Sequence, residues 1–394
     1  MSRWKDFKLG DVAEVKGGKR LPKGELLTTE KTPHPYIRIT DFDGHKINLS
    51  AIQYVTEEVQ KSISRYIVNK QDIIISNVGT IGLCAKIPDE LDNANLTENC
   101  VKLVFDKNKI DTNFLYYHLI SPDTQELING LDVGSTQPKL PIYNIQKIDI
   151  SLPPLEEQKA IAEVLSSLDD KIDLLHRQNK TLESLAQTIF RQWFIEEAKE
   201  EWEEVLITDL FEVRDGTHDS PKQKEFGKKL LTSKHILKNK LDFESSYFIS
   251  EEDFEKINQR SVVEQGDILF SMIGTIGLTY LEQSNEIDYA IKNIGLFKTS
   301  QNKKFMYFVY LWLNSSFGVE FIHENRSGST QEYISLGSLR NIIFNLPNYK
   351  IIDLFNEKME PIFEKINTNM KQIKSLENLR DTLLPKLLSG EVKL

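Results

Sequence analysis

The chain has 394 residues, 40% of them hydrophobic and 9% aromatic, which is enough apolar material for two or three compact domains. No run approaches the roughly 18 apolar residues of a membrane span, and "MSRWKDFKLG" holds no signal-peptide core, so we expect a cytoplasmic protein without a membrane partner. Cys84 and Cys100 lack C-x-x-C spacing and histidine neighbours, so we expect two buried thiols, no disulfide framework and no metal site.

The net charge of −10 argues at first against a nucleic-acid partner, because phosphate binding normally shows as an excess of Lys and Arg. The charge is unevenly distributed, however. Residues 151–204 hold 6 basic and 13 acidic side chains, the largest single share of the deficit. Two stretches are basic: "KGGKRLPKG" contains no acid, and between residues 222 and 240 seven lysines face only Glu225.

The chain repeats itself at a spacing of 198 residues that falls to 194 along its length. "WKDFKLGDVAEVKGG" is matched by "WEEVLITDLFEVRDG", "SNVGTIGL" by "SMIGTIGL", and "GSTQ" occurs twice. The paired segments begin at Trp4 and Trp202, at Ser76 and Ser271, and at Gly134 and Gly328. The drift in spacing needs only small loop insertions, so the sequence predicts two copies of one structural plan.

The first part of each copy, residues 1–152 and 199–346, consists of short β-branched runs separated by Gly and Pro, with one helical stretch in each. We therefore expect two strand-rich α/β globular domains. "GTIG" is expected to close a hairpin in both, because glycine permits a tight turn; contact of this loop with bases is the alternative.

The second part of each copy, residues 153–198 and 347–394, has apolar residues at alternating steps of three and four, which is a heptad seam. Pro361 suits only the first turn of a helix, and Ser167 with Asp170 resembles a capping pair. The sequence thus predicts a break near 166 and 360, followed by long helices over 168–196 and 361–388.

Two seams of equal length are expected to form an antiparallel coiled coil. If paired positions sum to 548, Asn179 faces Asn369, and the least favourable pair is Arg380 with Leu168. A buried Asn pair costs stability but fixes the register. Because the first helix runs into the second domain, the second helix should return its end, near Leu394, to the start of the first domain.

The parts of the chain come in this order: a variable domain, the segment "LPPLEEQKAIAEVLSSLDDKIDLL", a second variable domain, and a helix with "LPKLLSGEVKL". In this order the chain resembles, over its whole length, the specificity subunit of type I restriction–modification systems. The second copy departs from the family pattern, with "LPNYKII" in place of "LPPLEEQ". The resemblance implies an α/β fold of two target-recognition domains, related by an internal pseudo-twofold repeat and separated by the antiparallel coiled coil. Each domain would read one half of a bipartite site in double-stranded DNA.

The same resemblance implies a subunit without catalytic residues or cofactors of its own. S-adenosylmethionine, ATP and Mg²⁺ would be bound by partners: modification (methyltransferase) subunits, expected to number two, and restriction subunits in the full complex. The acidic helical region fits a docking role better than a phosphate contact, since its charge repels DNA.

Candidate DNA-binding residues come from the repeated "GSTQ" and from the basic stretches. Gln can bond adenine through two hydrogen bonds, Ser and Thr can bind phosphate, and Lys and Arg neutralise it. The alternatives are a helix-capping loop and ordinary solvated surface. The candidates are Lys19, Arg20, Lys23, Ser135, Thr136, Gln137, Lys139, Lys222, Lys224, Lys234, Ser329, Thr330 and Gln331.

Enzymatic interpretations fit less well. Asp11, Glu14 and Lys16 superficially resemble a metal-dependent nuclease site, but the repeat has Arg214 at the lysine position. "LPPL" lacks the amide or acid that a base-flipping methyltransferase needs, and no phosphate-binding G-x-x-x-x-G-K-[ST] loop occurs. The remaining alternative is a non-catalytic coiled-coil scaffold that binds proteins through its globular ends.

Overall fold

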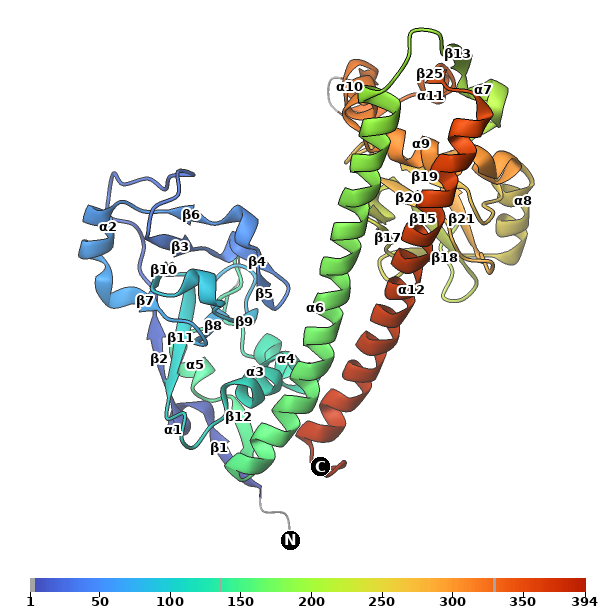
Figure 1. The fold of residues 1–394 in the computed structure, drawn as a ribbon. Helices are drawn as coiled ribbons and strands as arrows, with labels where there is room; N and C mark the ends of the chain where they lie inside the picture. The colour runs from blue at the N-terminus through green and yellow to red at the C-terminus, as the bar shows by residue number, and fades with distance from the viewer. Residues whose placement is uncertain (1–3, 135, 329–330) are drawn as a thin grey trace. The chain divides into compact units, whose positions relative to one another are not determined.

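The computed structural model describes residues 4–134, 136–328 and 331–394. The chain divides into two compact units: unit 1 runs up to Leu174 and includes Ile373–Leu394, and unit 2 is Leu175–Gln372. Both divisions fall inside the long helices α6 (Leu155–Arg191) and α12 (Tyr349–Leu388), so each unit contains one globular domain and part of each helix (Figure 1). The domain boundaries predicted from the sequence instead treat the helical regions, residues 153–198 and 347–394, as separate from both globular domains.

The first domain, in unit 1, is closed by pairing of its first and last strands, β1 (Lys5–Lys8) and β12 (Asp149–Leu152). One four-stranded sheet has the order β2-β11-β8-β9 and a second has the order β6-β3-β10-β7. The strands of the two sheets are β2 Ala13–Gly17, β11 Cys100–Phe105, β8 Ile73–Ser76, β9 Cys84–Lys86, β6 Gln53–Tyr54, β3 Pro35–Ile37, β10 Ala94–Leu96 and β7 Ile67–Val68. The other elements are α1 Leu9–Val12, η1 Ile39–Asp41, β4 Phe42–Asp43, β5 Lys46–Ile47, η2 Leu49–Ala51, α2 Glu57–Ser62, η3 Ser64–Tyr66, η4 Asp89–Leu91, α3 Thr112–Ile120, α4 Pro122–Gly130 and α5 Ile142–Ile145.

The second domain, in unit 2, repeats most of this plan, although its second sheet has three strands where that of the first domain has four. β13 (Glu203–Leu206) pairs with β25 (Ile343–Leu346), one sheet has the order β14-β22-β19-β20, and another has the order β18-β15-β21. The sheet strands are β14 Val213–Asp215, β22 Ile294–Phe297, β19 Ile268–Ser271, β20 Thr279–Leu281, β18 Tyr247–Ile249, β15 Lys228–Thr232 and β21 Tyr289–Lys292. The other elements are α7 Ile207–Leu210, η6 Ser233–His235, β16 Ile236–Leu237, β17 Lys240–Leu241, α8 Glu251–Ser261, η7 Thr299–Phe305, α9 Met306–Leu313, α10 Ser316–Glu324, β23 Arg326–Ser327, β24 Tyr333–Ile334 and α11 Leu336–Arg340.

The two matching element orders confirm the predicted fold class: two strand-rich α/β domains built as an internal repeat, with two long helices. The sheets β2-β11-β8-β9 and β14-β22-β19-β20 each bury one face on a helix later in the same domain, α3 or α9, because these helices are apolar almost all round. Among the described residues, no helix combines the length and apolar character needed to cross a bilayer.

The predicted breaks near 166 and 360 are wrong, because α6 (Leu155–Arg191) and α12 (Tyr349–Leu388) are continuous. Ser167 does not cap a helix; its Oγ donates to the carbonyl of Val164 within α6, at 2.7 Å. Pro361 lies inside α12, where a missing N–H costs about 3 kcal/mol. Met359 and Ile362 are buried on either side of it, so packing of the seam outweighs that cost.

In unit 2, α6 and α12 run antiparallel. Phe190, late in α6, packs against Phe355, early in α12, with ring centroids 6.3 Å apart. Earlier in α6 and later in α12, Asn369 Nδ2 donates to Asn179 Oδ1 at 2.8 Å, and both side chains are buried. A five-residue π turn, Gln192–Glu196, continues α6 to the predicted end of the helix.

In unit 1, the helices show how the least favourable pair of the predicted register, Arg380 with Leu168, is accommodated. Arg380 does not face an apolar side chain alone, because its guanidinium donates to Asp169, the neighbour of Leu168, at 2.9 Å. Burial alone would lower the pKa of Arg380, but its bonds to Asp169 and Asp381 outweigh this and raise the pKa.

The end of α12 belongs to the first domain. A Cβ on Gly390 would lie 3.5 Å from the Trp4 ring, and Leu384 and Leu387 share a core with Leu9. The predicted return of the second helix to the start of the first domain is therefore confirmed for the described residues; Met1 lies outside them.

The two cysteines are buried and free, as the sequence predicted. Burial raises the pKa of both thiols, Cys84 and Cys100, to about 12, so they behave as small core side chains.

Candidate nucleic-acid interface

The repeated "GTIG" closes a β-hairpin in each domain, as predicted. In unit 1 it joins β8 to β9, and in unit 2 it joins β19 to β20. Ser76 Oγ donates to the Thr80 carbonyl at 2.6 Å and accepts the Leu83 N–H at 2.9 Å. Ser271 makes the same two bonds in the second copy, at 2.6 and 2.8 Å. The repeated serine thus ties each loop to its strand, a signal present in the sequence but not recognised there.

The "GSTQ" loop of unit 1 packs against this hairpin. Gly79 N–H donates to the Pro138 carbonyl at 2.9 Å, Lys139 pairs with Val78, and a Cβ on Gly79 would lie 3.7 Å from Gln137 Nε2. The Asp132 carboxylate closes the loop by accepting the N–H groups of Gly134 and Lys139, both at 2.8 Å. These backbone hydrogen bonds lower the pKa of Asp132. The loop is therefore a turn held by an aspartate rather than a helix cap.

In unit 2 the residues after the second "GSTQ" also pair with the hairpin, but Arg326 stands at the repeat position of Asp132. The second "GSTQ" connects β23 to β24, and Tyr333 pairs with Ile273 of the hairpin loop, where the Met272 carbonyl accepts the Ile334 N–H at 3.0 Å. Gln331 is exposed. Thr136, Gln137 and Lys139 are exposed in unit 1, whereas Ser135, Ser329 and Thr330 lie outside the described residues.

The basic loop of unit 1, defined as residues 18–28, reaches the hairpin through the turn between β10 and β11. Lys19 N–H donates to the Leu96 carbonyl at 2.8 Å, and Arg20 Nε donates to Glu98 Oε1 at 2.5 Å. In the same turn, the Asn99 carbonyl accepts the N–H of Asn77, at the base of the hairpin loop, at 2.9 Å. Lys19, Arg20, Gln137 and Lys139 therefore belong to one connected set of loops.

The second basic loop is named for Lys222 and Lys224; it spans residues 216–227, where Asp219 and Glu225 offset the charge of the two lysines. It is connected to its hairpin through the turn between β21 and β22. Lys292 Nζ donates to Ser220 Oγ, and Ser233 Oγ donates to the Asn293 carbonyl, both at 2.5 Å. Ser233 Oγ also accepts the Met272 N–H at 3.1 Å, which places Lys234, the next residue, beside the hairpin.

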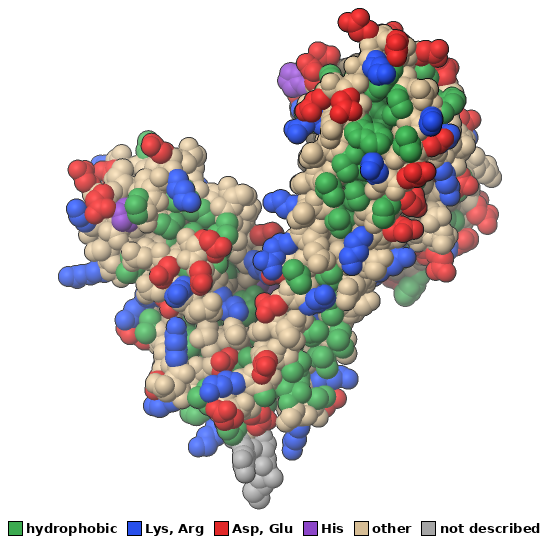
Figure 2. Space-filling model, viewed as in Figure 1, with side chains coloured by type: hydrophobic (Ala, Val, Ile, Leu, Met, Phe, Trp, Pro, Cys, Tyr) green, Lys and Arg blue, Asp and Glu red, His purple; other side chains and the backbone are tan. Residues whose placement is uncertain are grey.

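Three of the predicted lysines lie further from the hairpins. Lys23 is in an exposed turn of the first basic loop, Lys222 is exposed in the second, and Lys224 is hydrogen-bonded through its N–H to Phe248 at the sheet edge. On the face shown in Figure 2, basic and acidic side chains alternate over both units. This face is therefore not uniformly basic, and a phosphate contact on it would be local.

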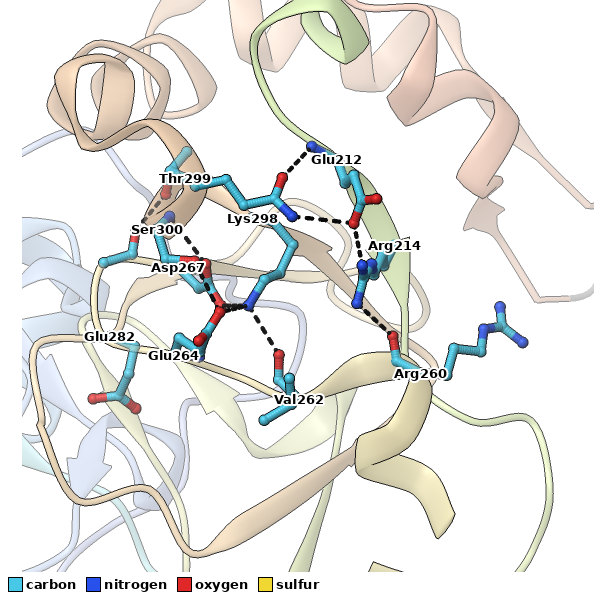
Figure 3. Close-up of polar contacts among 12 residues, drawn as sticks. Glu212, Arg214, Arg260, Val262, Glu264, Asp267, Glu282, Lys298, Thr299 and Ser300 are labelled. Atoms are coloured by element: carbon cyan, nitrogen blue, oxygen red, sulfur yellow. Dashed lines mark hydrogen bonds and ion pairs between the residues drawn. The ribbon is translucent and has the colours of Figure 1, made fainter. Parts of the chain in front are cut away.

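Sequence reasoning missed a buried ion cluster beneath the hairpin of unit 2 (Figure 3). Lys298 Nζ donates to Glu264 and Asp267, each at 2.6 Å, and to the Val262 carbonyl at 3.1 Å. Lys298 is 2% exposed and Asp267 is 0% exposed. The bond to Lys298 lowers the pKa of Glu264. The cluster joins the start of β19 to the end of β22, so it holds the strand that carries the hairpin.

Unit 1 has only a weak counterpart to this cluster. Asp72, at the repeat position of Asp267, lies 3.9 Å from Lys102 Nζ, and that lysine comes from a different position on the paired strand. Because the lysine position differs between the copies, comparison of the repeats gave no signal for the cluster.

The repeat gives two domains of one fold, each with a hairpin loop and a "GSTQ" loop that pair with each other. The family described as "Type I restriction modification DNA specificity domain" matches residues 1–184 and 199–378, and the chain belongs to this family. The MjaIX specificity subunit of Methanocaldococcus jannaschii is 27% identical, over 99% of this chain and 94% of that protein. The HindI specificity subunit of Haemophilus influenzae is 21% identical over the full length of both chains.

The solved structures include the same fold. The S subunit of a type I restriction–modification system from M. genitalium is similar with a TM-score of 0.59 and 18% identity, covering 98% of this chain and 96% of that one. The similarity therefore covers both domains and both long helices.

Proposed function

We propose that this chain is the DNA-recognition subunit of a type I restriction–modification complex, and that each domain reads one half of a bipartite duplex site. The observation that carries the proposal is the occurrence, in both domains, of the same set of connected loops: a serine-tied hairpin, a "GSTQ" loop and a basic loop. The scaffold is shared while exposed side chains differ. Lys139 of the first set is replaced by Tyr333 in the second, so the half-sites are expected to differ.

The helices offer the docking sites for partner subunits in this proposal. Leu185 in α6 and Leu379 in α12 occupy the same repeat position, 194 residues apart, and each is 46% exposed. Two equivalent apolar positions fit two copies of one partner, the modification subunit. The acid excess of residues 151–204 favours a protein over a phosphate backbone there.

Catalysis is assigned to the partners. S-adenosylmethionine would be bound by the modification subunits, and ATP and Mg²⁺ by the restriction subunits that complete the complex. The contribution of this chain is to place those subunits on the site that its domains recognise. Such a role belongs in the cytoplasm, where the DNA is.

The experiment uses the chain in complex with the modification subunits encoded with it. Duplexes bound by the wild-type complex are selected from a random 40-bp library, and Gln137→Ala and Gln331→Ala are then measured on the selected duplex. A bidentate contact is worth about 1–3 kcal/mol, so each change should weaken discrimination about 5- to 150-fold at one half only. The exposed Gln372→Ala, on α12, is the control and should leave both halves unchanged.

Equal loss at both halves would contradict the assignment of one loop set to each half-site. If the wild-type complex binds no duplex even at low salt, where phosphate contacts are strongest, the protein-binding scaffold becomes the better interpretation.

A further inference from the structure

Each basic loop presents one strongly exposed apolar side chain. Leu26 in unit 1 and Phe226 in unit 2 are both 83% exposed, the highest values among the large hydrophobic side chains of the described residues. Their sequence neighbours are lysines and a glutamate, "PKGEL" and "PKQKEF", in which both the Pro-Lys start and the Glu before the apolar residue recur.

In unit 1 the backbone around Leu26 is fixed. Gly24 adopts a φ of +94°, which glycine favours, and Glu25 N–H donates to the Pro22 carbonyl at 3.1 Å. Two residues after Leu26, Thr28 exchanges backbone hydrogen bonds of 3.0 and 2.9 Å with Tyr54 at the end of β6. The exposed leucine therefore lies on a turn anchored on both sides.

The second domain builds an anchored turn at the corresponding sheet edge with different residues. Two residues before Phe226, Lys224 N–H donates to the Phe248 carbonyl of β18 at 2.9 Å. Immediately after Phe226, Gly227 has a φ of +143°, and a Cβ there would overlap the Ile249 carbonyl oxygen. Only glycine fits, so this close approach fixes the backbone that carries the phenylalanine.

The surroundings indicate what these side chains meet. Lys23 beside Leu26, and Lys222 and Lys224 beside Phe226, are exposed, and both loops connect to the hairpins of the candidate interface. Duplex DNA presents this combination of chemistry, with phosphates for the lysines and, in the grooves, base edges and thymine methyl groups that accept apolar side chains.

We propose that Leu26 and Phe226 are apolar probes that enter a groove of the duplex, one in each half-site, while the adjacent lysines bind the flanking phosphates. This inference rests on the proposed DNA-recognition function and adds residues to it that the "GSTQ" and lysine patterns do not include. Because leucine and phenylalanine differ in size and flatness, the two probes select different base steps.

The test measures binding of the complex with modification subunits to the duplex selected from the random library, at several salt concentrations. Phe226→Ala and Leu26→Ala should each weaken binding about tenfold, with an unchanged slope of log Kd against log salt, because apolar contacts release no counterions. The double change Lys222→Ala and Lys224→Ala should instead lower that slope by about 2, because two phosphates are no longer neutralised. Phe226→Leu should recover part of the affinity.

Val319→Ala on α10 and Leu127→Ala on α4 are the matched controls, since these side chains are 61% and 49% exposed but lie outside the basic loops. Both should bind the duplex like the wild type. Wild-type affinity of Phe226→Ala and Leu26→Ala would overturn the inference and leave the proposed function standing. So would a decrease in affinity accompanied by failure of the modification subunits to co-purify. Absence of any duplex binding by the wild-type complex would overturn both.

Discussion

The buried pair Asn179 and Asn369 allows a quantitative test of what holds the helices in register. Asn369 Nδ2 donates to Asn179 Oδ1 at 2.8 Å, but Asn179 Nδ2 and Asn369 Oδ1 have no hydrogen-bond partner among the residues that the structure describes. Changing Asn369 alone to Leu removes the bond and leaves the whole buried amide of Asn179 unsatisfied. The expected loss in the free energy of unfolding is about 1–3 kcal/mol.

The double variant, with Leu at both positions, should behave differently. It removes all four polar groups and places apolar side chains in the seam, so we expect stability equal to or greater than that of the wild type, by up to about 2 kcal/mol. The two single losses would then fail to add, with a coupling of about 2 kcal/mol or more.

Urea unfolding followed by tryptophan fluorescence measures these differences. Of the four tryptophans, Trp193, Trp202 and Trp312 lie in unit 2 with the Asn pair, and Trp4 lies in unit 1. On a Trp4→Phe background the signal therefore reports unit 2 alone. A double variant destabilised by the sum of the two single changes would refute the reasoning, because the pair would then be a net source of stability.

Three further substitutions probe the second hairpin and its support, and the same fluorescence signal measures their effect on stability. Lys298→Met leaves the Asp267 carboxylate buried without its cation, and we expect a loss of about 3–5 kcal/mol; a loss below about 1 kcal/mol would mean that the cluster contributes little. Gly277 has a φ of +94° and a Cβ there would lie 2.9 Å from Ile322, whereas Gly274 has a φ of +80° and open space around it. Gly277→Ala should therefore cost about 1–2 kcal/mol more than Gly274→Ala, and equal costs would show that crowding at Ile322 is not what restricts this turn.

The repeat made most of the architecture predictable. Matching sequence segments occur twice for the sheets, the hairpin loops and the helices, so an element predicted in one copy was supported independently by the other copy. Glycine in "GTIG" indicated the turn through local backbone preference, which depends little on the rest of the fold. The seam located the Asn pair because heptad spacing sets which side chains face a partner helix.

The errors and omissions arose where long-range contacts decide the outcome. Pro361 is unfavourable inside a helix by local rules, but burial of Met359 and Ile362 is a tertiary effect that local rules do not contain. The turn that joins the basic loop to the hairpin in unit 1 involves backbone groups of Leu96 and Asn99, and backbone contacts leave no mark in side-chain patterns. Leu26 and Phe226 gave no periodic signal in the sequence, because they lie in loops and belong to no helical or strand pattern.

The position of the last helical turns in unit 1 has a consequence for synthesis of the chain. Residues 175–372 contain every element of unit 2, whereas the core around Leu9 and Leu165 is complete only when Leu384 and Leu387 pack against it. The half that is translated first is thus the half that finishes folding last. A chain truncated before residue 373 would contain all of unit 2 but would lack Leu384 and Leu387, so its first half should stay incomplete and aggregation-prone.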